Sequence, residues 1–407
     1  MSSEHCVIIG ASHAGVQLAT SLRREGWPHL ISLVDSNRSL PFQRPPLSKG
    51  FMQADTASPP LNLRPEQFYR ENSIALLNHC TASELDRHAK TVVLNDGQKL
   101  RYSKLVLATG TSARQPPIPG RNLPGVFYLR SLGDAQQLKT ALANTRTAVV
   151  IGGGYIGLET AATLQRLGVA VTVVESASRV LQRVTAPEIS TFYARVHHEE
   201  GVKLLTGCHV QAIEGDKHVR TVHLSSGQSI PTDMVIIGVG VEPNTGLAEV
   251  AGLTVSNGIA VDKYLRSNDP DILAIGDCCN HFNPFYQRRI RLESVQNAVD
   301  QAKSAAKTLC GYPSEYRAMP WFWSDQYDIK LQIAGLSSGY DELVTRGSTA
   351  AGRSFAVFYY RKGRLIAVDA INRPKEFLFA KNLLAAGRNA QPDKLRDETI
   401  DLRDITD

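Results

Sequence analysis

Several features that define particular classes of protein are missing from this sequence of 407 residues. No stretch approaches the ~18 consecutive apolar residues that a membrane-spanning helix requires. The N-terminus carries no basic leader followed by an apolar segment and a small-residue cleavage site, so we expect a cytoplasmic protein. The formal net charge is +6, but no Lys/Arg-rich run with interleaved aromatics occurs, and we do not expect a nucleic-acid partner.

A cysteine framework is missing as well. The six cysteines are irregularly spaced and form no C-x-x-C: Cys6, Cys80, Cys208, Cys278, Cys279 and Cys310. In a chain of this length we expect reduced thiols, most of them buried. The neighbours Cys278 and Cys279 are interpreted as two packed thiols, with a redox role as the alternative. No cysteine cluster could hold an iron–sulfur centre, and no metal site is predicted.

The sequence does contain a repeated pattern. Two segments each consist of a predicted strand, a glycine turn, a helix and a second strand that ends in an acid. The first segment runs from Cys6 to Asp35 and the second from Ala148 to Glu175. Their strands are continuous apolar runs, which is typical of parallel strands buried on both faces of a sheet. The pattern predicts two dinucleotide-binding units in a chain long enough for two or three domains.

The second segment carries the more complete glycine motif. Its turn is Gly152-Gly153-Gly154-Tyr155-Ile156-Gly157, which fits G-x-G-x-x-G between a strand and a helix. Such a turn gives a pyrophosphate room and free N–H groups at a helix N-terminus. Glu175 follows Gly157 by about 18 residues, where an acid binds a ribose hydroxyl.

The helix after this turn has a predicted core face. Ile156, Ala161, Leu164 and either Leu167 or one of its neighbours recur at helical spacing, and Gly168 is placed as the C-terminal cap.

The first motif departs from the pattern at one position. It is Gly10-Ala11-Ser12-His13-Ala14-Gly15, so Ser12 stands where the middle glycine is expected. A serine there either crowds the pyrophosphate or donates a hydrogen bond to it. His13 either contacts the ligand or faces solvent. Asp35 lies about 20 residues after Gly15, as the pattern requires.

The preferred nicotinamide dinucleotide is partly predictable. A carboxylate at Glu175 would repel the 2′-phosphate of NADPH, which favours NADH. Arg179 and Arg183 lie close enough in sequence to complicate this choice.

The texture of the sequence changes after about residue 318. Alternating and aromatic segments, such as 355–360 and 365–370, predict antiparallel strands, and a helix is predicted near Phe377 to Ala386. We therefore expect an α/β protein with two Rossmann-like dinucleotide-binding domains and a C-terminal α+β domain.

With these motifs together, the sequence resembles the FAD-dependent NADH:ferredoxin reductases of oxygenase and cytochrome P450 systems, the putidaredoxin-reductase-like group. Its relatives include rubredoxin reductases, apoptosis-inducing factor and glutathione reductase. The resemblance covers nearly the whole chain. It implies a discontinuous FAD domain of residues 1–112 and 246–317, an NAD domain of residues 113–245, and a C-terminal domain of residues 318–407.

The resemblance also implies roles for particular residues. Arg44 and Lys49, in Leu40-Pro-Phe-Gln-Arg-Pro-Pro-Leu-Ser-Lys49, would contact FAD, and Lys49 with Glu159 would be the catalytic pair beside the flavin and nicotinamide. The alternatives are a solvated lysine and an ordinary first-turn glutamate. The other implied cofactor contacts are Ala82, Thr109, Gly110, Arg130, Arg183, Gly240, Asp277, Val295 and Trp323.

The implied activity is hydride transfer from NADH to FAD, then single-electron transfer to an acidic [2Fe-2S] ferredoxin. The segment from Leu40 to Lys49 contains no cysteine, which argues against the thiol chemistry of glutathione-reductase relatives. Candidate docking groups for the ferredoxin are Arg288, Arg289, Arg291, Arg361, Lys362, Arg364, Arg373 and Lys375. The alternatives are a rubredoxin reductase, an NADH:quinone reductase and an NADH-sensing flavoprotein. We expect a monomer or weak homodimer.

Overall fold

A computed structural model describes residues 4–53 and 61–405, which form two compact units. The first unit contains residues 4–43, 61–112 and 242–320, and the second contains residues 44–53, 113–241 and 321–405. The chain passes from one unit to the other within β8 (Thr111–Ala113) and β17 (Val241–Pro243). Residues 44–53 make their contacts with the second unit, although they precede most of the first unit's strands in sequence.

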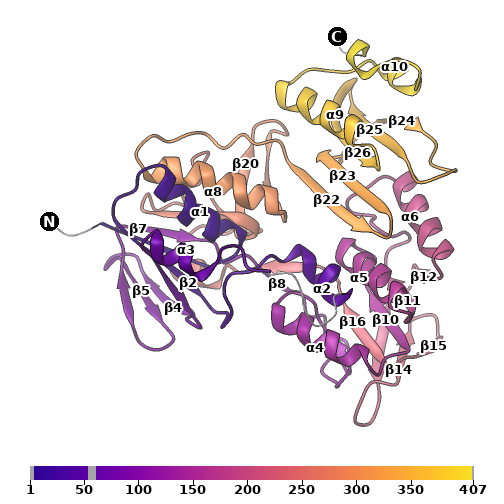
Figure 1. The fold of residues 1–407 in the computed structure, drawn as a ribbon, viewed down its shortest axis with the longest axis horizontal. Helices are drawn as coiled ribbons and strands as arrows, with labels where there is room; N and C mark the ends of the chain where they lie inside the picture. The colour runs from indigo at the N-terminus through magenta and orange to yellow at the C-terminus, as the bar shows by residue number, and fades with distance from the viewer. Residues whose placement is uncertain (1–3, 54–60, 406–407) are drawn as a thin grey trace. The chain divides into compact units, whose positions relative to one another are not determined.

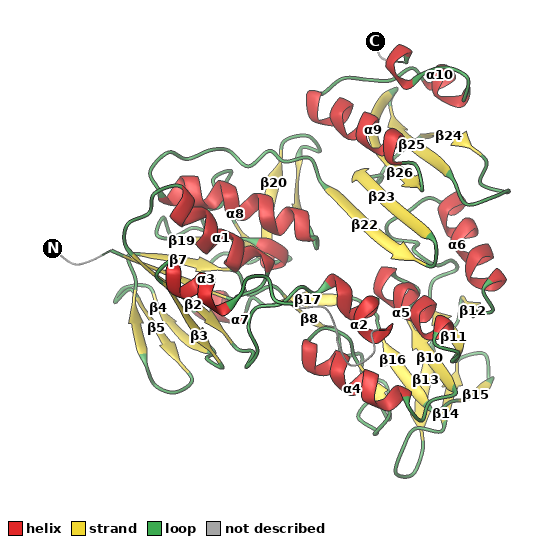
Figure 2. Ribbon diagram, viewed as in Figure 1, coloured by secondary structure: helices red, strands yellow, loops and turns green. Residues whose placement is uncertain are grey.

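The first unit is built on a parallel sheet of five strands in the order β19-β7-β1-β2-β3. The strands are β1 (His5–Ile9), β2 (Leu30–Asp35), β3 (Ile74–Asn78), β7 (Lys104–Leu107) and β19 (Ile272–Ala274). Helices α1 (His13–Arg24) and α8 (Val295–Leu309) lie side by side against it (Figure 2). The central strands are buried along nearly their whole length, as their continuous apolar runs predict.

Smaller elements complete this unit. One antiparallel sheet has the order β4-β5-β6 and another sheet has the order β18-β20-β21. Their bounds are β4 (Ala82–Asp86), β5 (Thr91–Leu94), β6 (Lys99–Arg101), β18 (Ile259–Ala260), β20 (Cys279–Asn283) and β21 (Arg288–Arg291). The short helices are α3 (Glu66–Glu71) and α7 (Gly246–Val250).

The second unit repeats the first unit's parallel sheet, in the order β12-β11-β10-β16-β9 (Figure 1). The strands are β9 (Val126–Phe127), β10 (Thr147–Ile151), β11 (Ala170–Glu175), β12 (Lys203–Thr206) and β16 (Met234–Ile237). Its helices are α2 (Gly50–Gln53), α4 (Leu132–Leu142), α5 (Tyr155–Arg166) and α6 (Pro187–Glu199), and a 3-10 turn spans Pro45–Ser48. A three-stranded antiparallel sheet is formed by β13 (Val210–Glu214), β14 (Thr221–Leu224) and β15 (Ser229–Pro231).

The C-terminal part of the second unit is an antiparallel sheet in the order β22-β23-β26-β25-β24. Its elements are β22 (Trp321–Gln326), β23 (Ile329–Gly335), β24 (Glu342–Gly347), β25 (Phe355–Arg361), β26 (Arg364–Ile371), α9 (Pro374–Ala386) and α10 (Pro392–Arg396). Helix α9 packs on β23 and β26. The predicted fold class, with two Rossmann-like sheets and an α+β C-terminal region, is confirmed.

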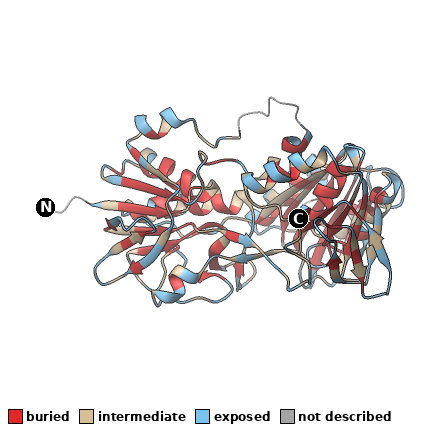
Figure 3. Ribbon diagram, turned by 90° about the horizontal axis from the view of Figure 1, so that it is seen from below, coloured by how far each residue is buried: buried red, intermediate tan, exposed pale blue. Residues whose placement is uncertain are grey.

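Burial agrees with most of the sequence expectations, and the central strands of the three five-stranded sheets are largely buried (Figure 3). The predicted core face of α5 is confirmed at Ala161 and Leu164, which are fully buried, and is wrong at Ile156, which is 48% exposed. Leu167 is 41% exposed. Ile156 lies in the first turn and Leu167 ends the helix, so both lie beyond the stretch that packs on the sheet. Gly168 follows the helix with φ +82°, as its role in ending the helix requires.

The adjacent cysteines Cys278 and Cys279 are both fully buried, and burial raises the pKa of each thiol. Within the described residues, no helix has the length and apolar character needed to cross a membrane.

Candidate functional site

Each parallel sheet has a point where the strand order reverses direction, and open α/β sheets bind ligands at the carboxyl ends of the strands there. In the first unit the reversal lies between β1 and β7, and in the second between β10 and β16. Both predicted glycine turns follow the inner strand at this point: Gly10 follows β1 and Gly152 follows β10.

The first glycine of each turn needs its missing side chain. Gly10 has φ +108° and Gly152 has φ +109°, a region that favours glycine. A Cβ on Gly10 would lie 2.2 Å from the Ala108 carbonyl oxygen, and one on Gly152 would lie 2.4 Å from that of Gly238. Each turn therefore packs directly on the strand across the reversal.

The last glycine of each motif is equally constrained. A Cβ on Gly15 would lie 1.9 Å from the Gly10 carbonyl oxygen, and one on Gly157 would lie 2.0 Å from that of Gly152. Glycine at these positions lets each helix start tight against its own turn. The two motifs thus have the same internal packing.

The backbone conformation at the middle position of the motif explains why a serine is tolerated at residue 12. Ser12 has φ −106° and its counterpart Gly154 has φ −81°, so any residue can adopt either backbone. A Cβ on Gly154 would meet nothing within 4 Å. Serine therefore causes no strain in the first turn. Its hydroxyl lies 3.5 Å from the His13 Nδ1 and does not cap α1.

The two helix N-termini fit a bound phosphate group. No side chain caps the N-terminus of α1 or α5, and neither first turn holds an acid. First-turn N–H groups at the end of a helix dipole attract anions. Open space at Gly154 adds the room that a pyrophosphate needs for close approach. The turn from Gly152 to Gly157 therefore has both features, and the turn from Gly10 to Gly15 has the uncapped helix N-terminus with Ser12 at the middle position.

The acids that end the second strands are close to these turns. Glu175 accepts hydrogen bonds from the Gly153 N–H at 2.6 Å and the Ala177 N–H at 2.7 Å. Asp35 is 6% exposed and accepts from the Asn37 side chain at 2.9 Å. Both lie at the carboxyl end of the strand next to the turn, where the predicted ribose contact requires an acid.

In the first unit, Thr109 and Gly110 follow β7 and are held by a residue that sequence reasoning missed. The Thr109 hydroxyl donates to the Asn244 carbonyl oxygen at 2.7 Å, and the Asn244 amide donates to the Thr109 carbonyl oxygen at 2.9 Å. Asn244 has no signal in the sequence beyond following a proline, because its partners lie about 130 residues earlier.

Asp277 follows β19 and lies in the same unit. Its carboxylate accepts from the Thr111 hydroxyl at 3.4 Å. The preceding Gly276 would place a Cβ 3.1 Å from the Ala14 Cβ. Asp277 is thereby placed beside the first turn of α1.

In the second unit, the predicted pair of Lys49 and Glu159 is formed. The Lys49 Nζ lies 2.6 Å from Glu159 Oε2. Glu159 is only 3% exposed and accepts two further hydrogen bonds, from the Ser48 hydroxyl at 2.8 Å and the Ser324 hydroxyl at 2.7 Å. Glu159 is the fifth residue of α5 and is buried, so it is not the ordinary first-turn glutamate of the alternative interpretation.

Arg44 and Arg130 are also brought together in this unit. The Arg44 guanidinium donates to the Arg130 carbonyl oxygen at 2.7 Å, and the Arg130 N–H donates to Asp134 at 3.0 Å. Asp134 and Ser131 form the capping box that starts α4. The segment around Arg44 is thus held against the start of a helix.

The arginines after Glu175 have different roles. The Arg179 guanidinium donates to the Thr185 carbonyl oxygen at 3.0 Å and to the Ser190 hydroxyl at 2.5 Å, so it is used within the fold. Arg183 is exposed, and its guanidinium would lie 3.7 Å from a Cβ on Gly240. Arg183 and Gly240 therefore lie together, as a shared dinucleotide contact requires.

The remaining predicted residues are more scattered. Ala82 starts β4 in a separate small sheet, and Val295 is the first residue of α8. Trp323 lies in β22 with its ring centroid 5.8 Å from that of Trp321. The neighbour of Trp323, Ser324, is the residue that reaches Glu159.

Two of the basic docking candidates are not exposed cations. The Arg291 side chain is 11% exposed and pairs with Glu293 at 2.7 Å. Arg373 pairs with Glu376 at 3.2 Å and with Glu398 at 2.8 Å. The candidates on the surface are Arg288, Arg289, Arg361, Lys362, Arg364 and Lys375.

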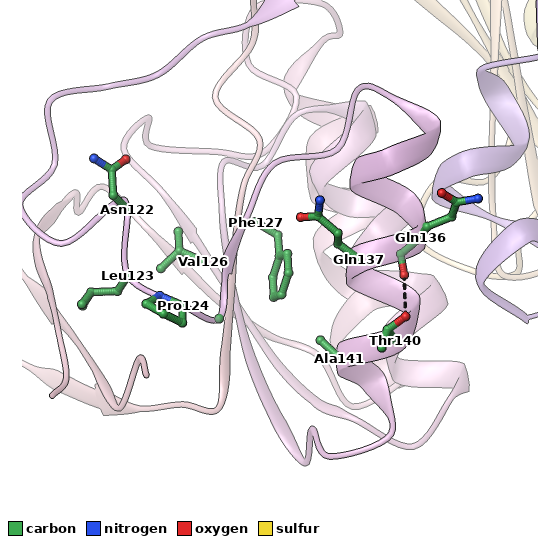
Figure 4. A pocket seen from close by; sticks show the side chains of 10 residues that line it. Asn122, Leu123, Pro124, Val126, Phe127, Gln136, Gln137, Thr140 and Ala141 are labelled. Atoms are coloured by element: carbon green, nitrogen blue, oxygen red, sulfur yellow. Dashed lines mark hydrogen bonds between the residues drawn. The ribbon is translucent and has the colours of Figure 1, made fainter. Parts of the chain in front are cut away.

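A shallow hollow also lies in the second unit, between helix α4 and residues 122–127, which include β9 (Figure 4). Asn122, Gln136 and Gln137 give it amide groups, and the Thr140 hydroxyl donates to the Gln136 carbonyl oxygen at 3.0 Å. Its lining contains none of the predicted site residues and no acid or base.

Comparison with known proteins agrees with this geometry. Residues 4–302 match the family described as pyridine nucleotide-disulphide oxidoreductase, and residues 321–406 match the reductase C-terminal domain. Rhodocoxin reductase from Rhodococcus erythropolis is 42% identical over 398 residues, which cover 98% of this chain and 93% of that protein. A rubredoxin-NAD(+) reductase from Pseudomonas putida is 40% identical over 370 residues, which cover 91% of this chain and 96% of that protein.

A solved structure is similar over nearly the full length. In the crystal structure of the covalent putidaredoxin reductase–putidaredoxin complex, the matching chain has a TM-score of 0.95 and 41% identity. The match covers 98% of this chain and 97% of that one. This chain belongs to the pyridine nucleotide-disulphide oxidoreductase family and is an oxidoreductase that uses FAD and NAD(P)H.

Proposed function

We propose that this chain is an NADH:ferredoxin reductase that passes electrons one at a time to a [2Fe-2S] ferredoxin of a cytochrome P450 or ring-hydroxylating oxygenase. The observation that carries the proposal is the presence of two equivalent glycine turns, one in each unit, together with the buried Lys49–Glu159 pair. Two dinucleotides are what a reductase of this kind must hold. No cysteine lies near Lys49 in sequence to divert the electrons to a thiol.

FAD is assigned to the first unit and NADH to the second. The turn from Gly10 to Gly15, Asp35, Thr109 and Asp277 would hold FAD, and the turn from Gly152 to Gly157 with Glu175 would hold NADH. When bound, FAD supplies the conversion of a two-electron hydride donor into a one-electron donor. The proposed FAD domain keeps the boundaries expected from the sequence, residues 1–112 and 246–317. The proposed NAD domain is residues 113–245, and the C-terminal domain is residues 318–407.

The protein's own residues would bind FAD and NADH and orient them. First-turn N–H groups of α1 and α5 would hold the pyrophosphates, and Asp35 and Glu175 the riboses. Lys49 would place a positive charge where reduced flavin is negative, and Glu159 fixes the position of the Lys49 ammonium at 2.6 Å. No protein acid or base is required for hydride transfer itself.

NADH is the proposed donor because Glu175 would repel a 2′-phosphate. Of the two nearby arginines that could offset this repulsion, Arg179 is occupied by the Thr185 carbonyl and the Ser190 hydroxyl. Only Arg183 is exposed beside Gly240. In Glu175→Ser, we expect the ratio of kcat/KM for NADH to kcat/KM for NADPH to fall about tenfold. Adding Arg183→Ala to that variant is expected to remove the gain in NADPH use. An unchanged preference in Glu175→Ser would contradict the assignment.

The proposed carrier is acidic and docks on basic groups. Lys362 is exposed at the β25–β26 turn, within the region that carries most of the remaining exposed candidates. Lys362→Glu is expected to slow reduction of the ferredoxin about fivefold at low salt and much less at moderate salt. Lys99→Glu, at another exposed lysine, one in β6, is the matched control. Equal effects of the two variants, or a salt-independent rate, would contradict a docking surface here.

Stopped-flow absorbance tests the activity. The FAD-loaded protein is mixed with NADH, and then with an oxidised [2Fe-2S] ferredoxin, a rubredoxin or a quinone. Rapid flavin bleaching followed by rapid reoxidation by the ferredoxin is expected. Faster reoxidation by rubredoxin would favour the second candidate, which is supported by the 40% identical rubredoxin reductase. Bleaching without reoxidation by any carrier would favour an NADH sensor.

A cytoplasmic location and a monomer or weak homodimer complete the proposal. Sedimentation of the FAD-loaded protein over a range of concentrations tests the second point.

A further inference from the structure

Glu159 is the end point of a chain of hydrogen bonds that runs through the second unit. The Ser324 hydroxyl donates to Glu159 Oε1 at 2.7 Å, and the Gln326 Nε2 donates to the Ser324 oxygen at 3.3 Å. The Gln326 Oε1 lies 2.8 Å from the His197 Nε2. The His197 Nδ1 lies 3.1 Å from the Tyr327 hydroxyl. Four side chains are thus linked in series to Glu159, the partner of Lys49: Ser324, Gln326, His197 and Tyr327.

The direction of this chain follows from its carboxylate end. A carboxylate only accepts, so the single proton of Ser324 points to Glu159. The Ser324 oxygen must then accept from the amide nitrogen of Gln326, which turns the Gln326 oxygen toward His197. His197 is therefore protonated at Nε2 and accepts at Nδ1 from Tyr327. Every donor points toward Glu159.

The chain cannot act as a proton path. The carboxamide of Gln326 lies in its middle and has no proton to pass on without becoming an imidic acid. Burial lowers the pKa of His197 to about 4, against the smaller opposing effects of Gln326 and Glu200. His197 therefore stays neutral near pH 7. The chain transmits orientation and polarisation only.

The far end of the chain is fixed by charged groups. His197 lies in α6 and is fully buried, whereas Tyr327 begins the β22–β23 turn. Arg353 joins these two elements, because its guanidinium lies 2.8 Å from Glu200 and 2.5 Å from Asp328. The Arg166 guanidinium lies 5.7 Å from the Tyr327 ring centroid. Arg353 thus ties the end of α6, the helix that carries His197, to the turn that follows Gln326.

We propose that Ser324, Gln326 and His197 are positioning residues for the Lys49–Glu159 pair. Glu159 receives Ser324 on one oxygen and both Ser48 and Lys49 on the other. With the Ser324 donor on Oε1, the carboxylate cannot rotate without losing a bond, and Lys49 Nζ is held in one place. The kinetic part of this inference rests on the proposed function. The direction of the hydrogen bonds does not rest on the proposed function.

Nitrogen-15 NMR of histidine-labelled, FAD-loaded full-length protein tests the direction. The His197 signals are assigned by their absence from His197→Gln. We expect a neutral ring with the proton on Nε2 between pH 6 and pH 8. An imidazolium, or a proton on Nδ1, would overturn the chain. This result does not depend on NADH or on any acceptor, so it stands or fails separately from the proposed function.

The kinetic test uses Ser324→Ala. Loss of one hydrogen bond to a charged group is expected to lower the limiting rate constant of flavin reduction by NADH about tenfold. The NADH dissociation constant is expected to change less than about twofold, because no NADH contact is lost. Thr232→Val is the control, since Thr232 is a buried hydroxyl that donates to the Met234 carbonyl oxygen at 2.8 Å, away from the chain. An equal rate loss in both variants would overturn the positioning role.

Gln326→Glu gives a second, isosteric test. A carboxylate there would compete with Glu159 for the Ser324 proton and would favour an imidazolium at His197. We expect the rate to fall as in Ser324→Ala, and the His197 signals to change to those of a charged ring at pH 7. A normal rate with a neutral His197 in this variant would contradict the inference.

Discussion

Asp369 provides the sharpest test of the electrostatics of the second unit. It lies in β26 and is fully buried. The Tyr359 hydroxyl donates to its Oδ2 at 2.6 Å, while Oδ1 has no hydrogen-bond partner within the described residues. Burial raises the pKa of Asp369 to about 7, although the Tyr359 bond lowers it in part. Asp369→Asn would keep an acceptor for Tyr359 and remove the titration.

The sign and size of the effect follow from linkage. An unfolded aspartate loses its proton near pH 3.8, whereas the folded Asp369 keeps its proton to about pH 7. The free energy of unfolding of the natural protein therefore falls as the pH rises from about 4 to 7, because unfolding releases a proton. Moving one pKa from 3.8 to about 7 corresponds to about 4 kcal/mol, the upper bound of the effect. The free energy of unfolding of Asp369→Asn does not fall in this way, because asparagine does not titrate.

The assay is thermal unfolding of the FAD-loaded protein at pH 4.5, 6 and 8. We expect Asp369→Asn to gain on the natural protein as the pH rises, by up to about 8 °C in Tm, at about 2 °C per kcal/mol for a unit of this size. Tyr359→Phe is the matched change of opposite sign: it removes a bond to the carboxylate and is expected to lower the Tm most at pH 8. Parallel Tm profiles for the natural protein and Asp369→Asn would refute the reasoning.

Three further predictions concern the candidate site. Gly154→Ala should leave the Tm within about 1 °C, because the added Cβ meets no protein atom. It should weaken NADH binding about tenfold in an equilibrium titration, because the Cβ enters the space left for the pyrophosphate. Gly152→Ala should instead disrupt folding, because its Cβ would lie 2.4 Å from a carbonyl oxygen. Lys49→Met should lower stability by about 3 kcal/mol in denaturant titration, since it leaves buried Glu159 without its cation, and Glu159→Gln in that background should recover most of the loss. Asn244→Ala should speed the release of FAD on dilution, because the Thr109 backbone loses its clamp; unchanged release would contradict that role.

The sequence predicted those parts of the site that depend on short segments. A strand, a glycine turn, a helix and a terminal acid lie within about 30 residues, so their spacing alone predicts their arrangement. The structure places Gly10 and Gly152 in the same positive-φ conformation, with the same kind of carbonyl contact. The family resemblance is confirmed by the match over residues 4–302 and 321–406. The predicted contact of Lys49 with Glu159 is also present.

The polar groups around Glu159 could not be predicted in the same way. Ser48, Ser324 and His197 come from three distant segments, and a single buried serine has no pattern that distinguishes it from a surface serine. Ile156 was predicted to be buried because its helical spacing matches the core, but it lies in the first turn of α5 and is 48% exposed. Arg291 was predicted to be a surface cation because its hydrogen bond to the Asp277 carbonyl oxygen, 14 residues earlier, forms only in the folded chain.

The three-segment makeup of the first unit affects how the chain is made. Strand β7 ends at residue 107, but its neighbour β19 begins at residue 272, and α8, which packs against α1, follows at residue 295. At a synthesis rate of about 5–20 residues per second, the nascent β7 waits roughly 8–30 seconds for its edge partner. The contiguous residues 113–241 emerge during that wait with a complete parallel sheet of their own. A newly made chain therefore displays an unfinished sheet edge and the uncovered face of α1 while all strands of its second parallel sheet have already been made.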